Sequence, residues 1–199
     1  HSYLDLVNIK SDILAIGGRV ELSVKLINSV VSVEIYSEKT TTWTHQYMQM
    51  IEHSSYYVTS FLSRLYLVGR LIKNIDKSLG SCYTYDINSN SWKDIANLNV
   101  ARDNAACTVF EGKIVVSGSY TKSVEAYDYY ENIWTNLPDM IEKRSYHASV
   151  SMGNKLFVIG GYFNTNCEVF DSSSRKFTLL ETHLPKYDYY IRSVSRAVY

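Results

Sequence analysis

A unit of about 42 to 49 residues repeats along the 199-residue chain, and this period limits the folds that are open to it. Three tryptophans, Trp43, Trp92 and Trp134, mark the unit, and Phe177 continues the series at the same spacing. An aromatic residue stands seven positions before each marker; these residues are Tyr36, Tyr85, Tyr127 and Phe170. The shared pattern predicts one strand that recurs in four structural units.

Each copy is preceded by a short apolar run that ends at glycine, at residues 13–18, 65–69, 114–118 and 156–161. Such runs are too short for helices and rich in β-branched and aromatic residues, so they predict buried strands. A basic residue follows three of the markers at ten positions: His53, Arg102 and Arg144. These landmarks place repeats at 1–52, 53–101, 102–143 and 144–191, with the start of a fifth at 192–199.

Each unit has room for about four strands, and a single four-stranded sheet cannot bury both of its faces. Stacking the sheets radially around an axis buries each apolar face against a neighbour. The sequence therefore predicts an all-β fold, a β-propeller with about four four-stranded blades.

Charge and cysteine content narrow the partners and the compartment. Lys+Arg and Asp+Glu are equal at 20 each, which argues against nucleic acid and anionic membrane surfaces as partners. No apolar run is long enough for a membrane helix. The three cysteines form no disulfide framework or metal-binding pair, and no signal sequence is recognisable at the start. We therefore expect a cytoplasmic protein without a cofactor or metal.

These landmarks resemble the kelch repeat, in which a glycine doublet is followed by Tyr-Asp, then by Trp, and then by Arg. The resemblance covers essentially the whole chain, and the fourth unit fits best, from Arg144 through Gly160-Gly161 to Phe170-Asp171. The doublet is eroded in the second and third units, and Ser37 stands in the first unit where Asp is usual. Kelch propellers usually have more blades than four, so the resemblance implies an incomplete ring.

In kelch domains of the BTB-kelch family, two loop positions of each blade commonly line the partner-binding mouth. Carried over, the residues after the basic position are Ser2, Ser54, Asp103, Ser145 and Ser193. The residues after the glycine doublet are Arg19, Leu71, Tyr120 and Tyr162. We expect Arg102, Arg144 and Arg192 to add charge to the same mouth. Tyrosine and arginine are favoured at protein interfaces, so this set suits an extended peptide or loop, including an acidic one.

The alternative for these arginines is structural, since a repeated basic residue can tie one blade to the next through buried hydrogen bonds. The Trp and Tyr markers are expected in the core, and the cysteines as small buried apolar residues.

The resemblance also implies a biological role. Kelch propellers of this type usually follow BTB and BACK domains and recruit substrates to a cullin ubiquitin ligase. The 199 residues contain neither domain, so the link to a cullin would run through parts outside this chain. Similar kelch proteins without those domains occur in viruses and as actin-associated proteins, and both remain alternatives.

An enzymatic role is the third alternative, because some kelch-like propellers are catalytic. A copper radical oxidase would need a Tyr/His/Cys grouping, but the five histidines lack the spacing of metal ligands. A sialidase-like propeller would carry a glycine in the turn before Trp92, and residues 86–91 contain none. We therefore expect a binding protein and not an enzyme.

Overall fold

The computed structural model of the chain describes residues 4–9, 12–17, 30–49, 54–72, 77–86, 89 and 91–184. Within these residues the fold is all-β, with sixteen strands in four antiparallel sheets of four strands each. The predicted fold class is therefore confirmed. The part of the chain that the structure describes contains no helix that could span a membrane.

Each sheet is one blade, built from four strands that are consecutive in the sequence. Blades 1 and 2 comprise β1 (Leu4–Ile9), β2 (Asp12–Gly17), β3 (Val30–Ser37), β4 (Thr42–Gln49), β5 (Ser54–Phe61), β6 (Arg64–Ile72), β7 (Lys77–Asp86) and β8 (Ser91–Ile95). Blades 3 and 4 comprise β9 (Ala105–Phe110), β10 (Lys113–Gly118), β11 (Val124–Asp128), β12 (Ile133–Leu137), β13 (Ala148–Met152), β14 (Lys155–Ile159), β15 (Asn166–Asp171) and β16 (Lys176–His183).

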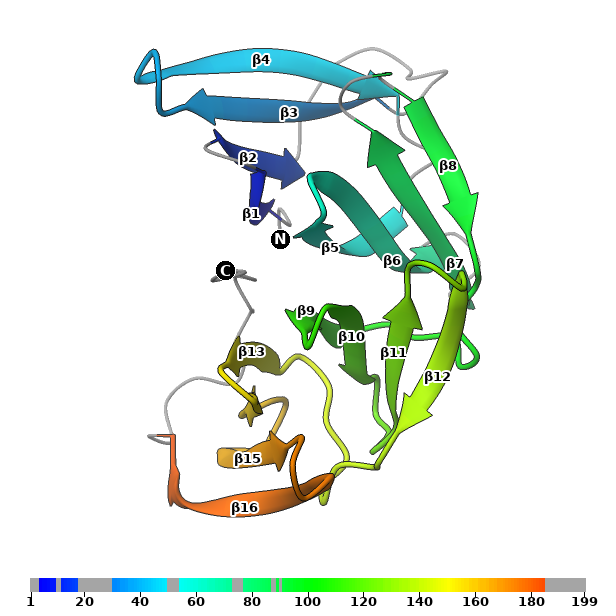
Figure 1. Cartoon of the computed structure of the whole chain (residues 1–199), viewed down its shortest axis with the longest axis vertical. Coiled ribbons are helices and arrows are strands. Elements are labelled where there is room, and N and C mark those ends of the chain that lie inside the picture. The colour runs from blue at the N-terminus through cyan, green and yellow to red at the C-terminus, as the bar shows by residue number, and fades with distance from the viewer. Residues whose placement is uncertain are drawn as a thin grey trace.

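The four blades are arranged as an arc around a common axis (Figure 1). The first strand of each blade lies innermost, and these strands contact one another in the order β1, β5, β9, β13. The fourth strands, β4, β8, β12 and β16, lie at the periphery. Among the described residues the ring is not closed between blade 4 and blade 1 (Figure 1). The arrangement is that of a propeller with an open side.

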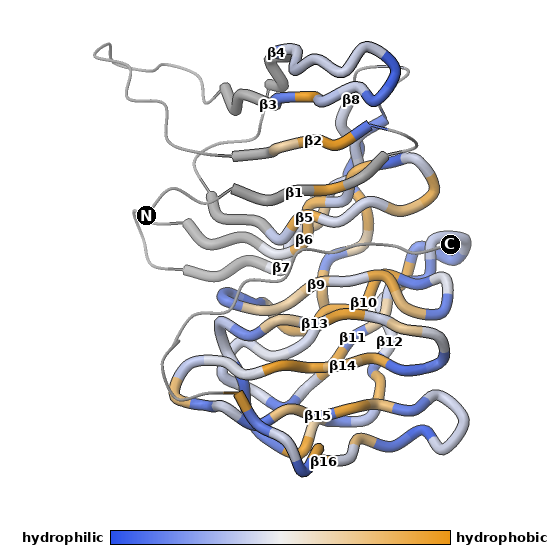
Figure 2. Tube along the Cα trace, turned by 90° about the vertical axis from the view of Figure 1, so that its left-hand side faces the viewer, coloured by the Kyte–Doolittle hydropathy of each residue, from blue (hydrophilic) through white to orange (hydrophobic). Residues whose placement is uncertain are grey.

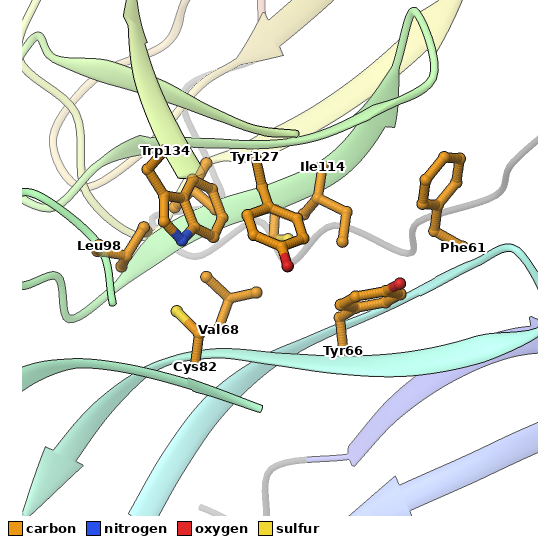
Figure 3. Close-up of a cluster of buried hydrophobic side chains, with 11 residues drawn as sticks. Phe61, Tyr66, Val68, Cys82, Leu98, Ile114, Tyr127 and Trp134 are labelled. Atoms are coloured by element: carbon orange, nitrogen blue, oxygen red, sulfur yellow. The ribbon is translucent and has the colours of Figure 1, made fainter. Parts of the chain in front are cut away.

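Apolar side chains between neighbouring blades form the core. The cluster between blades 2 and 3 includes Tyr66, Val68 and Cys82 from one sheet, which face Ile114 and Tyr127 of the next (Figure 3). These side chains alternate along their strands with others that point to the opposite face, as the pleat requires. Each inner blade therefore buries both of its faces. Figure 2 shows the result, with hydrophobic segments along the strands and hydrophilic segments at many of the turns.

The repeated aromatic pair and the Asp that follows it have distinct structural tasks. The rings of Tyr127 and Trp134 pack with centroids 5.1 Å apart, and Trp134 Nε1 donates to the carbonyl of Ala96 between blades 2 and 3 at 2.8 Å. Asp128 Oδ1 accepts hydrogen bonds from two backbone amides of the following turn. Lys113 and these amides hold the pKa of Asp128 below its usual range. The Tyr-Asp and Trp landmarks thus position a hairpin turn and join neighbouring blades.

Candidate partner-binding surface

The loops between the second and third strands of blades 3 and 4 lie beside the segments that lead into these blades. Residues 119–123 form the first loop and residues 160–165 the second, and the entering segments are residues 99–104 and 138–147. Backbone hydrogen bonds join them: Tyr120 N donates to Arg144 O at 2.9 Å, and Tyr162 N donates to Ser145 O at 2.8 Å. Loops from two blades are thereby held together at one side of the propeller.

Large aromatic side chains are exposed on these loops. We define the aromatic ledge as Tyr120, Tyr146, Tyr162 and Phe163. Tyr120, Tyr162 and Phe163 are between 42% and 74% exposed, although aromatic residues of this size are usually covered in folded proteins. The Tyr162 ring centroid lies 6.1 Å from that of Tyr146 and 4.2 Å from that of Phe163. Tyr146, Tyr162 and Phe163 therefore present contiguous aromatic area to a partner, and Tyr120 adds an exposed ring on the neighbouring loop.

The backbone of the ledge adopts a conformation that residues with side chains seldom use. Tyr120, Tyr146 and Phe163 have φ values of 57°, 54° and 53°. A left-handed residue other than glycine costs about 1–2 kcal/mol, and it persists where surrounding contacts hold it. Those contacts include the inter-blade bond from Tyr146 N to Asn104 O at 2.8 Å. The backbone that carries the aromatic side chains is thus held in place before any partner arrives.

Arg102 and Arg144 do not lie on this surface, and the sequence-based prediction that they supply charge to a binding mouth is wrong. Both side chains are fully buried. Arg102 Nη2 pairs with Glu125 Oε1 at 2.8 Å, and Arg144 Nη2 pairs with Glu168 Oε1 at the same distance. Each arginine donates two hydrogen bonds to a buried glutamate, and it is therefore unavailable to a partner. Arg102 and Arg144 therefore give no support to an acidic partner, and the other two predicted arginines, Arg19 and Arg192, lie outside the described residues.

The two arginines perform equivalent tasks in blades 3 and 4. The Nη1 group of Arg102 donates to the carbonyls of Gly118 and Ser123, at the two ends of the β10–β11 loop. Arg144 Nη1 donates in the same way to Gly160 and Asn166, both at 2.7 Å. Each arginine thus fixes the base of the loop that carries the exposed aromatic residues. The geometry therefore supports a structural role for Arg102 and Arg144, and not a role in binding a partner.

Sequence reasoning missed the glutamates that neutralise the arginines. Glu125 also accepts hydrogen bonds from the backbone amides of Asn99 and Val100, at 2.7 and 3.2 Å. Glu168 accepts from the amides of residues 141 and 142 in the same manner. Each glutamate therefore secures the segment that enters its blade. The clue was present, because Glu stands two positions before the aromatic residue in three of the four repeats.

Two other predicted residues support the ledge without forming it. Asp103 is half-buried, and its Oδ1 accepts a hydrogen bond of 2.9 Å from Ser119 Oγ, which also accepts from Asp103 N. Ser145 is buried, so its predicted place on the binding surface is wrong. Its carbonyl instead anchors Tyr162. Tyr120 and Tyr162 are the predicted residues of blades 3 and 4 that the structure places together at an exposed surface.

The predicted positions in the other units are less fully described. Ser54 is the first residue of β5 and pairs with Ile72, and Leu71 lies near the end of β6. Ser2, Arg19, Arg192 and Ser193 lie outside the described residues, as does the predicted strand at 192–199.

Cysteine thiols and metal-binding side chains are the other groups that could carry chemistry in the described residues. The three cysteines are free and buried, as small apolar residues would be. Burial raises the pKa of the Cys82 thiol to about 12, which disfavours the reactive thiolate. No cluster of three or more His, Cys, Asp or Glu side chains suited to a metal ion occurs in the described ranges.

A cavity of about 320 Å³ lies between blades 3 and 4. The lining includes Glu111 of the β9–β10 turn, Lys113 at the start of β10 and Arg175 of the β15–β16 turn, and Phe110 and Phe170 form part of the wall. The β9–β10 and β15–β16 turns beside the cavity lie at one end of their sheets. The β10–β11 and β14–β15 loops, which carry residues of the ledge, lie at the opposite end. The cavity and the ledge are therefore separate features of the molecule.

Comparisons with known proteins agree with the geometry. The family described as Kelch motif matches residues 101–141 and 143–182. Human Kelch-like protein 38 is 36% identical over 91 residues, which cover 45% of this chain and 16% of that protein. Kelch-like protein 40 of Xenopus tropicalis is 33% identical over 100 residues, covering 48% and 16%. Kelch repeat protein C2 of Camelpox virus (strain CMS) is 24% identical over 147 residues, covering 71% and 28%. The matches span less than a third of each relative's own length.

Proposed function

The chain is a kelch-repeat β-propeller of the kelch-like family, and from this premise we propose that it binds a segment of a partner protein on the aromatic ledge. The observation that carries the proposal is the exposure of Tyr120, Tyr162 and Phe163 on loops that inter-blade hydrogen bonds hold together. Tyrosine contributes strongly to protein interfaces because it combines a large apolar ring with a hydroxyl group. A rigid backbone beneath these rings lowers the entropic cost of binding.

We propose further that this propeller is the substrate-recognition part of an adaptor for a cullin ubiquitin ligase. The support is the similarity to kelch-like proteins, together with the match of residues 101–141 and 143–182 to the Kelch motif. In this role the ledge holds the substrate, and the contact with the cullin belongs to BTB and BACK domains outside these 199 residues.

A second candidate role is that of a viral kelch protein that competes for the same partners. The match to the camelpox protein favours it, since that match covers 71% of this chain, more than the match to Kelch-like protein 38. Immunoprecipitation of the full gene product from infected or transfected cells separates the roles. Recovery of a cullin supports the adaptor, and recovery of the same partner without any cullin supports the competitor.

Binding at the ledge is tested by selecting peptides against the immobilised chain from a displayed random library. The triple variant Tyr120→Ala, Tyr162→Ala, Phe163→Ala is then titrated with the selected peptides. We expect its dissociation constant to rise by at least about 30-fold, as for the loss of an interface hot spot.

The matched control removes exposed apolar side chains elsewhere on blade 3, with Tyr130→Ala and Ile133→Ala in the β11–β12 hairpin. This variant should bind the peptides as the wild type does. Equal affinity of the wild type and the ledge variant would contradict the proposal. Near-ultraviolet circular dichroism of each variant shows whether the packed core is intact.

A further inference from the structure

The cavity between blades 3 and 4 lies where two aromatic rings fill the interface between blades 2 and 3. Tyr66, the third residue of β6, is fully buried in that interface (Figure 3), and Tyr129, which follows the last residue of β11, packs against the same cluster. The equivalent residues one blade further along are Val115, the third residue of β10, and Ser172, which follows the last residue of β15. Both line the cavity. Two large rings are thus replaced by small side chains, and the space between the blades stays open.

A set of hydrogen bonds that closes the rim between blades 2 and 3 cannot form between blades 3 and 4. Asn132 Oδ1 accepts a hydrogen bond of 2.9 Å from the backbone amide of Ala96 and one of 2.8 Å from Tyr127 Oη, so it ties the two blades together. In blade 4 the equivalents of Asn132 and Tyr127 are Arg175 and Phe170. A guanidinium accepts no hydrogen bond and phenylalanine has no hydroxyl group. The rim of the cavity is therefore left without this bridge.

Arg175 gives the cavity a cationic group that has no counter-ion among the described residues. Its side chain forms no hydrogen bond or ion pair with that part of the chain, and it lies beyond ion-pair distance of Glu111, the acidic residue of the lining. Lys113 also lines the cavity, but it pairs with Asp128 at 2.9 Å. The backbone of Arg175 is left-handed, with φ 53°, and a hydrogen bond of 2.8 Å from its amide to the carbonyl of Asp171 holds it there. A rigid turn therefore presents a free guanidinium at the rim.

We propose that this cavity binds a small aromatic carboxylate. The ring occupies the space that Tyr66 and Tyr129 fill one interface earlier, against the walls formed by Phe110 and Phe170. The carboxylate pairs with Arg175, since a guanidinium can bind a carboxylate through two parallel hydrogen bonds.

The size and charge of the cavity limit the ligand further. Its volume of about 320 Å³ lies at the lower end of the range for ligand sites, which suits a single ring with a short acid chain. Glu111 disfavours a ligand with a second negative charge, because like charges repel. The cavity and the aromatic ledge lie at opposite ends of the sheets, so this binding is independent of the partner proposed for the ledge.

Three compounds test the proposal by titration into the whole chain, labelled with nitrogen-15. The compound 3-phenylpropionate carries both the ring and the carboxylate, 3-phenylpropanol carries the ring without the charge, and acetate carries the charge without the ring. The amide chemical shifts of residues 110–113 and 172–176 report binding at the cavity. We expect 3-phenylpropionate to bind with a dissociation constant at least about tenfold lower than that of either reference compound.

Two variants separate the contributions of charge and space. Arg175→Gln should raise the dissociation constant of 3-phenylpropionate at least about tenfold, to that of 3-phenylpropanol, and Arg175→Lys should restore part of the difference. Ser172→Tyr introduces the residue of blade 3 at this position, and it should abolish binding of both aromatic compounds by filling the cavity. Arg175 is exposed and Ser172 is half-buried, so both variants should fold. Lys122→Gln is the control, because it removes an exposed cation from the β10–β11 loop at the other end of the sheet and should bind as the wild type does.

Three results would overturn the proposal. The first is the absence of a saturable shift with 3-phenylpropionate up to about 10 mM. The second is an equal affinity for 3-phenylpropionate and 3-phenylpropanol, or an unchanged affinity in Arg175→Gln, because the cavity would then not recognise a carboxylate. The third is unchanged binding in a folded Ser172→Tyr variant, which would place the ligand elsewhere on the molecule.

Discussion

At the residue scale, the buried ion pairs are the feature that most separates this chain from a simple stack of apolar sheets. Arg102 and Glu125 are both fully buried, and so are Arg144 and Glu168. A buried charge is tolerated only when a partner and further hydrogen bonds compensate for the loss of water. Here backbone carbonyls and amides of the loops complete each set. The buried charges are thus compensated only when the loops beneath the ledge are correctly placed.

Removing one partner of such a pair should be severely destabilising. We expect Glu125→Ala and Glu168→Ala each to lower the free energy of unfolding by about 3–5 kcal/mol, because an arginine remains buried without its counter-ion. Urea denaturation measures the change. The control Lys113→Ala breaks the partly exposed Lys113–Asp128 pair, and it should cost far less because solvent screens that pair. Similar losses in all three variants would contradict this interpretation.

His147 provides a second test, through pH. Its Nε2 shares a hydrogen bond of 2.8 Å with Ser117 Oγ across the interface of blades 3 and 4. Burial, and then the charges of Arg144 and Arg102, lower the pKa of His147 from 6.5 to about 3. Between these values the unfolded chain binds a proton that the folded chain does not, so stability rises with pH over this window and falls on acidification.

We expect the free energy of unfolding to drop by about 1 kcal/mol between pH 6 and pH 5 from His147 alone. His147→Gln should remove this part of the pH dependence, as measured by urea denaturation at each pH. His45→Gln is the matched control, because the His45 side chain is more than half exposed, and this variant should retain the wild-type dependence. An unchanged slope in His147→Gln would show that the histidine is not held neutral by the fold.

At the scale of the strand and loop, the first glycine of the doublet position fixes the distance to the next blade in blades 2 and 3, at Gly69 within β6 and at Gly118, the last residue of β10. Gly118 has φ +80°, and a Cβ there would lie 2.7 Å from the carbonyl oxygen of Arg144 and would also strike the His147 ring. Gly69 stands in the same relation to Arg102, at 3.1 Å. The first glycine of the doublet is therefore required by the approach of the next blade, which explains why erosion of the doublet removed only its second glycine.

Comparing two glycines separates backbone strain from this close approach. Gly112 has φ +68° and no atom within 4 Å of an added Cβ, so Gly112→Ala tests backbone strain alone. We expect Gly112→Ala to cost about 1–2 kcal/mol. Gly118→Ala should cost at least about 1–3 kcal/mol more, because the carbonyl of Arg144 cannot move without disturbing a buried ion pair. Equal losses in urea denaturation would exclude steric control of the blade spacing.

The strands were predictable from sequence because the same pattern of residues occurs in each of the four repeats. The apolar run at 114–118 lies within β10, and the stretch that ends at Asp128 is β11. The location of Arg102 was not predictable in the same way, since it depends on Glu125 across the sheet and not on its own neighbours. The ledge was found only in part: Tyr120 and Tyr162 follow a landmark, whereas the exposure of Phe163 results from a left-handed turn that the pattern does not encode.

At the scale of the whole molecule, stability should be distributed unevenly among the blades. In an array of repeats, each unit is stabilised by its own contacts and by those with its nearest neighbours. Blades 2 and 3 have a neighbour on both sides, whereas blade 1 has its described neighbour on one side only. Among the described side chains, the cluster between blades 1 and 2 has fewer buried members than the cluster between blades 2 and 3.

Amide hydrogen exchange measured by mass spectrometry should reveal this gradient. We expect the amides of β10 and β11 to exchange slowest and those of β3 and β4 fastest, because local opening of an end blade disrupts a single interface. Uniform protection of all four blades would instead show that the arc unfolds as one cooperative unit.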